Sequence, residues 1–232
     1  MCLMILASAL VGCGSKAAIG PFVTPTAAPM GEHPVTHPQG TCALCDLYYL
    51  ARQSVVLVRL ERSLGTGVIV GEEGLIVTNA HVVGDAESVT IELSDCSTTR
   101  ASVIARDAKI DLALLRVEAS DRVWLALMLE GDDRPPVGTD IYIIGHPLGL
   151  GWSVSRGVVS GHRRAGEVGP LGYIQTDAAI SPGNSGGPMV TGDSRIVGIV
   201  VSKLAGSGAE NIAFAIPVSD VRAFIEASKP TE

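Results

Sequence analysis

The stretch SPGNSGGP, residues 181–188, surrounds Ser185 with three glycines and two prolines. Glycine permits backbone dihedrals and close approaches that a Cβ would forbid, and proline fixes φ on either side. The stretch therefore predicts a tight, rigid loop that presents the hydroxyl of Ser185. The same residue types also form ordinary surface turns, so the loop alone leaves a catalytic serine and a simple turn open.

Short apolar runs surround this loop from about Leu47 onward, separated by Gly, Asp, Asn and Pro. They include SVVLVRL, LIVTNA, DLALLRV, DIYIIG, IVGIVVS and IAFAIPV. Many short β-rich runs at roughly regular spacing are typical of sandwiches or barrels and not of alternating βαβ units. Residues 119–138 are the expected connection between two strand-rich halves.

A single helix is expected, at the C-terminal end. Ser219 and Asp220 can cap the segment SDVRAFIEASK. The helix would dock through three apolar side chains on one face: Val221, Phe224 and Ile225.

Length and charge limit the function classes. A chain of 232 residues can bury a core without needing disulfides or metals. The net charge is −7 and no long basic run is present, which argues against nucleic acid as a partner. We expect no cofactor.

The first residues predict a targeting segment. The apolar run from Leu3 to Val11 is too short to span a bilayer and has the length of a signal-peptide core. The following LVGC resembles the bacterial lipobox, which implies a signal peptide over residues 1–12 and lipidation of Cys13. The protein would then be exported and anchored in the outer membrane, facing the periplasm. No Lys or Arg precedes the run, so the alternatives of an upstream start, an uncleaved signal or a chance apolar start stay open.

Residues 13–45 are rich in Pro, Thr, Ala and Gly and contain a CxxC motif. They predict an exposed tether, because such a composition buries too little apolar surface to fold.

A catalytic serine needs a base and a group that orients the base. Of the five histidines, His81 follows the apolar run LIVTNA, where burial can hold an imidazole in one rotamer. Asp111 precedes the run LALLRV, where a carboxylate is costly to bury unless a group such as an imidazole N–H bonds it. Each residue alone also fits a structural role. The chain order His81, Asp111, Ser185 is that of the chymotrypsin class.

Four segments resemble the protease domain of the HtrA/DegP family: GTGVIVGEEGLIVTNAHVV (65–83), DLALLRV (111–117), QTDAAISPGNSGGPMV (175–190) and NIAFAIPV (211–218). The resemblance covers roughly residues 47–228. It implies an all-β, trypsin-like fold of two six-stranded antiparallel barrels and serine endopeptidase activity. The protease domain is expected over 46–232, with barrels at about 46–120 and 137–218 and the helix at about 219–228.

The same resemblance implies residue roles. Ser185 would attack the scissile carbonyl, His81 would take and return the proton, and Asp111 would orient His81. The backbone N–H groups of Gly183 and Ser185 would form the oxyanion hole.

The substrate pocket also follows from the resemblance. Its base would lie at Ala179 and Ile180, and its opposite wall at Val201, Ser202 and Lys203. No Asp at the base could pair with Arg or Lys, so small or medium aliphatic residues are expected before the cut. The wall could also pair with an extended substrate as an added strand.

Partners follow from the family as well. The resemblance implies misfolded or unfolded polypeptides as substrates, and other copies of the chain as partners in a homo-oligomer, a trimer. HtrA proteins usually carry PDZ domains after the protease domain, whereas this sequence ends at Glu232, so no PDZ domain is expected.

Two residues depart from the family pattern or from the wider class. The turn commonly written GNP in HtrA proteins carries His146 at its second position. The residue before Ser185 is Asn184, which cannot form the ion pair with a newly cut N-terminus that activates trypsin-like zymogens. No activating cleavage is therefore expected.

Two other functions remain open. A barrel that had lost activity could act as a peptide-binding scaffold, but all three triad positions are intact. His33, His37, Cys42 and Cys45 show H-x3-H-x4-C-x2-C spacing, which could bind zinc. Prolines and the lack of a flanking finger or ribbon pattern argue against metal. Exported cysteines more often form disulfides, and the pairing among Cys42, Cys45 and Cys96 stays open.

Overall fold

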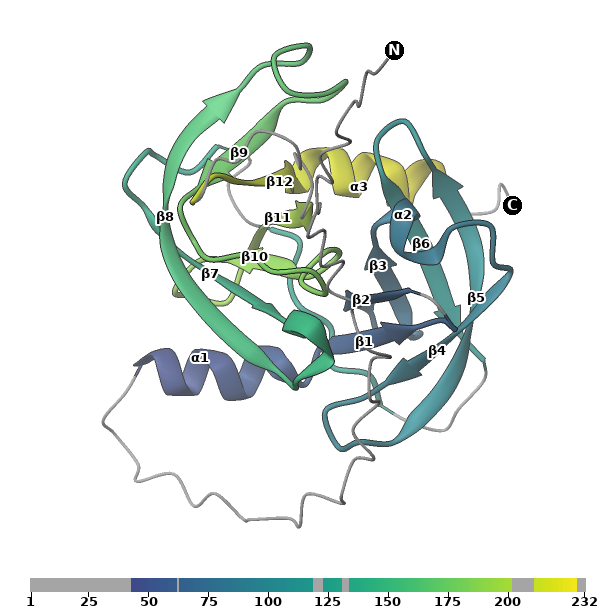
Figure 1. Ribbon diagram of the computed structural model, residues 1–232. Helices are drawn as coiled ribbons and strands as arrows, with labels where there is room; N and C mark the ends of the chain where they lie inside the picture. The colour runs from purple at the N-terminus through teal and green to yellow at the C-terminus, as the bar shows by residue number, and fades with distance from the viewer. Residues whose placement is uncertain (1–42, 62, 119–122, 131–133, 202–210, 229–232) are drawn as a thin grey trace, which may run out of the picture. The chain divides into compact units, whose positions relative to one another are not determined.

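The computed structural model describes residues 43–61, 63–118, 123–130, 134–201 and 211–228. Within these ranges, twelve strands form two closed antiparallel barrels of six strands each (Figure 1). The first barrel comprises β1 (Val55–Arg59), β2 (Leu64–Gly71), β3 (Leu75–Thr78), β4 (Ser88–Glu92), β5 (Thr98–Asp107) and β6 (Leu112–Val117). The second comprises β7 (Asp140–Gly145), β8 (Ser153–Arg163), β9 (Tyr173–Thr176), β10 (Pro188–Val190), β11 (Ile196–Val201) and β12 (Ala213–Pro217). The predicted fold class is confirmed.

The two barrels have the same strand connectivity. Neighbouring strands run β1-β2-β3-β6-β5-β4 in the first and β10-β11-β12-β9-β8-β7 in the second. Two short helical turns, α2 (Ala80–Val83) and η1 (Pro147–Gly149), follow β3 and β7. Each lies at the end of a strand, where a barrel exposes its connecting loops.

Alternation along the strands divides the apolar residues between separate cores. On β6, Ala113, Leu115 and Val117 belong to the core of the first barrel. Leu112 and Leu114 point the other way and join a cluster that also contains residues of the second barrel. Successive side chains of a strand point to opposite faces, so one short apolar strand can fill two cores. This explains why these strands are apolar almost throughout.

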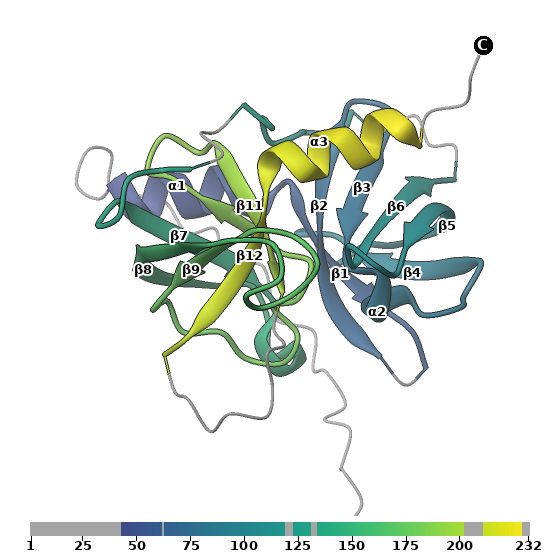
Figure 2. The same cartoon turned by 90° about the horizontal axis from the view of Figure 1, so that it is seen from above.

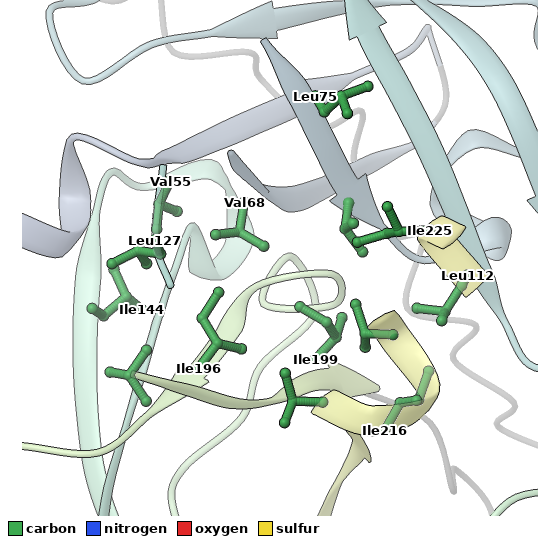
Figure 3. Packing of buried hydrophobic residues seen from close by; sticks show 14 of the residues in the cluster. Val55, Val68, Leu75, Leu112, Leu127, Ile144, Ile196, Ile199, Ile216 and Ile225 are labelled. Atoms are coloured by element: carbon green, nitrogen blue, oxygen red, sulfur yellow. The ribbon is translucent and has the colours of Figure 1, made fainter. Parts of the chain in front are cut away.

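The shared cluster joins the two barrels. Figure 3 shows Val68 and Leu112 of the first barrel in the same cluster as Ile199 and Ile216 of the second. These side chains are buried, so separating the barrels would expose them to water at a cost of about 25 cal/mol per Å² of apolar surface. The contact between the barrels is therefore a stable base for residues contributed by both.

Helix α3 (Val218–Ala227) lies across both barrels and packs on β6, β11 and β12 (Figure 2). The three apolar residues predicted to dock are all buried: Val221, Phe224 and Ile225. The expected cap is wrong, because β12 runs directly into the helix. Pro217 is the N-cap, with φ −58° and ψ 147°, and no side chain caps the helix. Ser219 therefore lies inside the first turn.

Helix α1 (Ala43–Arg52) corrects the expectation of a single helix. Leu47 and Ala51, one turn apart, are buried against the body of the protein, and α1 contacts β1 and β7. Tyr48 Oη donates a hydrogen bond to the carbonyl of Trp152 at 2.9 Å. In the described ranges, no helix has the length and hydropathy needed to cross a membrane.

Candidate active site

The three predicted catalytic residues lie in connections between strands. His81 is in α2, after β3, and Asp111 directly precedes β6. Ser185 lies between β9 and β10. The first two residues therefore come from the first barrel and the third comes from the second.

His81 and Asp111 are in direct contact. His81 Nδ1 lies 2.8 Å from Asp111 Oδ2 and 3.0 Å from Oδ1, and the backbone N–H of His81 donates to Oδ1 at 3.0 Å. Asn79 Nδ2 donates to the Asp111 carbonyl at 2.9 Å, while Asp111 has a left-handed backbone with φ 56°. Because Nδ1 faces the carboxylate, Nε2 is the ring nitrogen that can exchange a proton with another group. The His81 side chain is 40% exposed, so substrate can reach it.

The backbone around Ser185 is bonded to both barrels. The Ser185 carbonyl accepts the N–H of Thr66, on β2, at 2.8 Å. The next two residues pair with β11: Gly186 N–H donates to the Val200 carbonyl, and Val200 N–H donates to the Gly187 carbonyl, both at 2.9 Å. Ser185 itself is buried, at 3% exposure.

Gly186 brings the serine loop against the segment that leads to His81. Its φ is 85°, and a Cβ there would lie 2.1 Å from the carbonyl oxygen of Thr66 and 2.3 Å from Thr78 Oγ1. The same Cβ would lie 3.1 Å from the backbone nitrogen of Asn79, two residues before His81. Only glycine allows this approach.

The loop orients two backbone N–H groups. The carbonyl of Pro182 accepts a backbone N–H of η1 at 2.7 Å, and the carbonyl of Asn184 accepts the N–H of Gly187 at 3.0 Å. The described peptide bonds are trans, so each N–H points opposite to the carbonyl of its own peptide group. The N–H groups of Gly183 and Ser185 therefore point away from these bonds.

Gly183 is held by a residue that sequence reasoning missed. Its φ is 103°, and a Cβ would lie 2.2 Å from the carbonyl oxygen of His146. Its own carbonyl accepts a 2.6 Å hydrogen bond from Thr66 Oγ1. Thr66 is fully buried. The signal for its role was a polar residue within the apolar run GTGVIV.

Comparison with known proteins establishes the family. The family described as Trypsin-like peptidase domain matches residues 65–199. The chain belongs to this family. The chain is 42% identical, over 163 residues, to "Probable periplasmic serine endoprotease DegP-like" of Pseudomonas fulva (strain 12-X), covering 69% of this chain and 34% of the relative.

Two vertebrate proteins are also similar to this chain. It is 41% identical over 169 residues to "Serine protease HTRA1" of Xenopus tropicalis, covering 71% of this chain and 36% of the relative. It is 38% identical over 184 residues to "Serine protease HTRA1B" of Danio rerio, with coverages of 77% and 38%. The chain thus spans about a third of the length of these relatives. The resemblance to HtrA/DegP proteins is confirmed.

His146 lies next to Gly183 of the serine loop. Its side chain is 1% exposed, and its ring packs edge-on against Trp152 with centroids 4.0 Å apart. Neither ring nitrogen has a hydrogen-bond partner within the described part of the chain. Burial, with a smaller contribution from the charge of Arg59, lowers the pKa of His146 to about 4. The imidazole is therefore neutral at neutral pH.

The residues expected to form the substrate pocket are only partly described. Ala179 is exposed, and its carbonyl accepts a hydrogen bond from Ser155 Oγ at 2.8 Å. Ile180 is half-buried against the core of the second barrel, and Val201, at the end of β11, is also half-buried. Two further positions lie outside the described residues: Ser202 and Lys203.

The cysteines bear on the zinc and disulfide alternatives. Cys45 is disulfide-bonded, so its sulfur is not a thiolate that could bind zinc. Cys96 is exposed and not in a disulfide. The other residues of these predictions lie outside the described residues: Cys13, His33, His37 and Cys42. Within the described ranges, no group of three metal-ligating side chains was found.

Proposed function

We propose that this trypsin-like peptidase is a serine endopeptidase with Ser185 as nucleophile, His81 as general base and acid, and Asp111 as the residue that orients His81. The observation that carries the proposal is the contact of one carboxylate with both the ring and the backbone of His81, at 2.8 and 3.0 Å. Because Nδ1 faces this carboxylate, Nε2 is the ring nitrogen that would exchange a proton with Ser185. The serine protease names of the similar proteins support the same activity.

The reaction follows from these positions. His81 Nε2 takes the proton of the Ser185 hydroxyl as Oγ bonds to the scissile carbonyl carbon. The carbonyl oxygen becomes an oxyanion, which the N–H groups of Gly183 and Ser185 would stabilise. His81 then gives its proton to the leaving amine as the C–N bond breaks and an acyl-enzyme forms. A water molecule, deprotonated by His81, releases the acyl group and restores the Ser185 hydroxyl.

The proposed substrates are exported polypeptides in unfolded or misfolded form. We propose that small or medium aliphatic residues before the cut fit beside Ala179, Ile180 and Val201, with Ser202 and Lys203 completing the wall. The substrate would pair as an added strand with the backbone from Val201 to Lys203, which requires an extended and hence locally unfolded chain.

The proposed location is the cell envelope. The relative from Pseudomonas fulva is named periplasmic, which supports export of this chain. The signal peptide over residues 1–12 and the lipid anchor at Cys13 remain proposals that rest on the sequence. A homo-oligomer, a trimer as in the HtrA family, is proposed on resemblance alone.

A fluorophosphonate probe tests the proposal, because it reacts only with an activated serine. The full chain should be labelled, and Ser185→Ala should lose both labelling and cleavage of casein. Ser181→Ala is the matched control, since Ser181 lies in the same loop and should be labelled like the unsubstituted chain. A folded chain that the probe does not label would favour the inactive peptide-binding scaffold instead.

A further inference from the structure

Exposed leucines lie beside the serine loop. Leu148, in η1, is 62% exposed, and Leu150, just after η1, is 78% exposed. Leu64, at the start of β2, is half-buried. A Cβ on Gly149 would lie 3.0 Å from Leu64 Cδ2, so η1 and the start of β2 are in contact. We call Leu64, Leu148 and Leu150 the leucine rim.

The leucine rim is bonded to the loop that carries Ser185. The backbone N–H of Leu148 donates to the Pro182 carbonyl at 2.7 Å, three residues before Ser185. Leu64 and Thr66 are two residues apart on β2 and so share a face of the strand. The N–H of Thr66 bonds the Ser185 carbonyl at 2.8 Å. One part of the rim is therefore bonded directly to the loop that carries Ser185, and the other lies two residues from Thr66, which bonds Ser185 itself.

The hydrogen bonds of the serine loop indicate which side of the scissile bond the rim faces. The serine loop lies between β2, through the Thr66 to Ser185 bond, and β11, through the bonds of Gly186 and Gly187 to Val200. Val201 follows Val200 and belongs to the segment proposed to hold the acyl part of the substrate. The leucine rim belongs to the opposite side, where the leaving part of the substrate must pass.

Two further features set the rim apart from ordinary exposed leucines. Leu148 has φ 55° and ψ 15°, a left-handed conformation that is costly for a residue other than glycine. Backbone outliers of this kind concentrate at functional sites. Residues 145–155 contain no Asp, Glu, Lys or Arg, and their one histidine, His146, is buried. The surface that the rim offers is therefore apolar.

We propose that the leucine rim is an apolar subsite for the first or second substrate residue after the scissile bond. The inference rests on the proposed function and specifies the leaving side of its substrate. Leu or Phe at that position would bury apolar surface against Leu148 and Leu150, whereas Ser or Asp would not. Burying a side chain of this size corresponds to a preference of roughly tenfold or more in kcat/KM.

Quenched fluorescent peptides with one constant aliphatic acyl side test the inference. The first two leaving-side residues are varied among Leu, Phe, Ser and Asp, and the full chain is compared with Leu150→Ser and Leu148→Asn. Asn tolerates the left-handed conformation of position 148. The readout is the ratio of kcat/KM for Leu or Phe peptides to that for Ser or Asp peptides. Leu125→Ser, at an exposed leucine of the segment between the barrels, is the matched control.

The full chain and Leu125→Ser should share a ratio of roughly ten or more, and both rim variants should bring it several-fold closer to one. A ratio near one in the full chain, or one that neither rim variant changes, would overturn the subsite while leaving the protease intact. Rim variants that keep the ratio but change the sedimentation coefficient would show instead that a second copy covers the rim. A chain that cleaves no peptide and resists the fluorophosphonate probe would refute the proposed function itself.

Discussion

Thr66 Oγ1, on the first barrel, donates a 2.6 Å hydrogen bond to the carbonyl of Gly183 on the second, 117 positions away in sequence. The same oxygen accepts the backbone N–H of His146 at 3.1 Å. A hydroxyl has one donor and two acceptor lone pairs, so both bonds form together. One buried side chain thus fixes the backbone of two loops, one of which leads to Ser185.

Thr66→Val should therefore lower activity as well as stability. The substitution leaves the Gly183 carbonyl and the His146 N–H without their partner, at a cost of about 1–3 kcal/mol in the free energy of unfolding. A shift of the proposed oxyanion donors by about 1 Å would lower kcat roughly 100-fold. Urea unfolding and peptide cleavage measure the two effects. Thr66→Ser keeps the hydroxyl and should retain most activity; equal activity in the Val variant would contradict the role given to Thr66.

Asp111→Asn should preserve the fold and lower kcat by roughly 10⁴-fold. An amide can present N–H groups to His81 Nδ1, which favours the tautomer that cannot accept the Ser185 proton. Asp107→Asn is the control, because Asp107, at the end of β5, accepts a hydrogen bond from the backbone N–H of Lys109 and does not belong to the proposed triad. Cleavage rates at saturating peptide separate the variants. Similar rates for the two would argue that Asp111 only shapes its turn.

The two barrels could be predicted because their signal is local. Side chains of apolar runs such as DLALLRV point alternately into two cores, and the Gly, Asp, Asn and Pro residues between the runs mark the turns. Helix α1 was missed although Leu44, Leu47 and Ala51 have helical spacing and pack in or against the core. The helix is ten residues long and begins at Ala43, within the segment expected to be a tether. Tertiary packing on β1 and β7 decides its conformation.

The candidate site was predictable only in part. Motifs and chain order pointed to His81, Asp111 and Ser185. The hydrogen-bond partners of Thr66 and His146 could not be read from the sequence, because they lie in other loops: the backbone N–H of His146 bonds Thr66 Oγ1, 80 positions away. The N-cap predicted for the C-terminal helix α3 was wrong for a related reason. Pro217 fixes an extended backbone at the end of β12, so α3 begins before Ser219 can cap it.

His146 should make stability depend on pH in a defined window. Its pKa is lowered to about 4 in the folded chain from the ordinary value of 6.5. Between these values the unfolded chain binds a proton that the folded chain does not, so the free energy of unfolding falls as pH drops from 6.5 to about 4. The full effect is about 3 kcal/mol, and it is absent above the window.

Urea unfolding of the full chain and of His146→Asn between pH 7 and pH 4 tests this expectation. Carboxylates also titrate in the lower part of the range, so the readout is the difference between the two proteins at each pH. The variant should lose less stability on acidification. A difference that stays constant from pH 7 to pH 4 would show that the imidazole is not the titrating group.

The last prediction is that the chain needs no activating cleavage. In trypsin-like zymogens, a newly cut N-terminus pairs with an Asp immediately before the nucleophile and so shapes the oxyanion loop. Here that residue is Asn184, which is 6% exposed and uncharged. The loop is already bonded through the Pro182 carbonyl to η1, through the Gly183 carbonyl to Thr66, and through the Asn184 N–H to the Ser181 carbonyl at 3.0 Å. The chain from Gly40 onward should therefore react with a fluorophosphonate probe without trimming.

Intact-mass measurement of the labelled protein, with and without brief trypsin treatment, checks this. Labelling should be equal before and after treatment, and a substrate-like peptide that orders the loop further should increase it. Asn184→Asp separates the two mechanisms. A carboxylate at this buried position costs several kcal/mol unless an ammonium pairs with it, so the variant should label more weakly. If trypsin treatment switches labelling on, and Asn184→Asp strengthens it, then a cut N-terminus and not the bonds of Thr66 and η1 orders the loop.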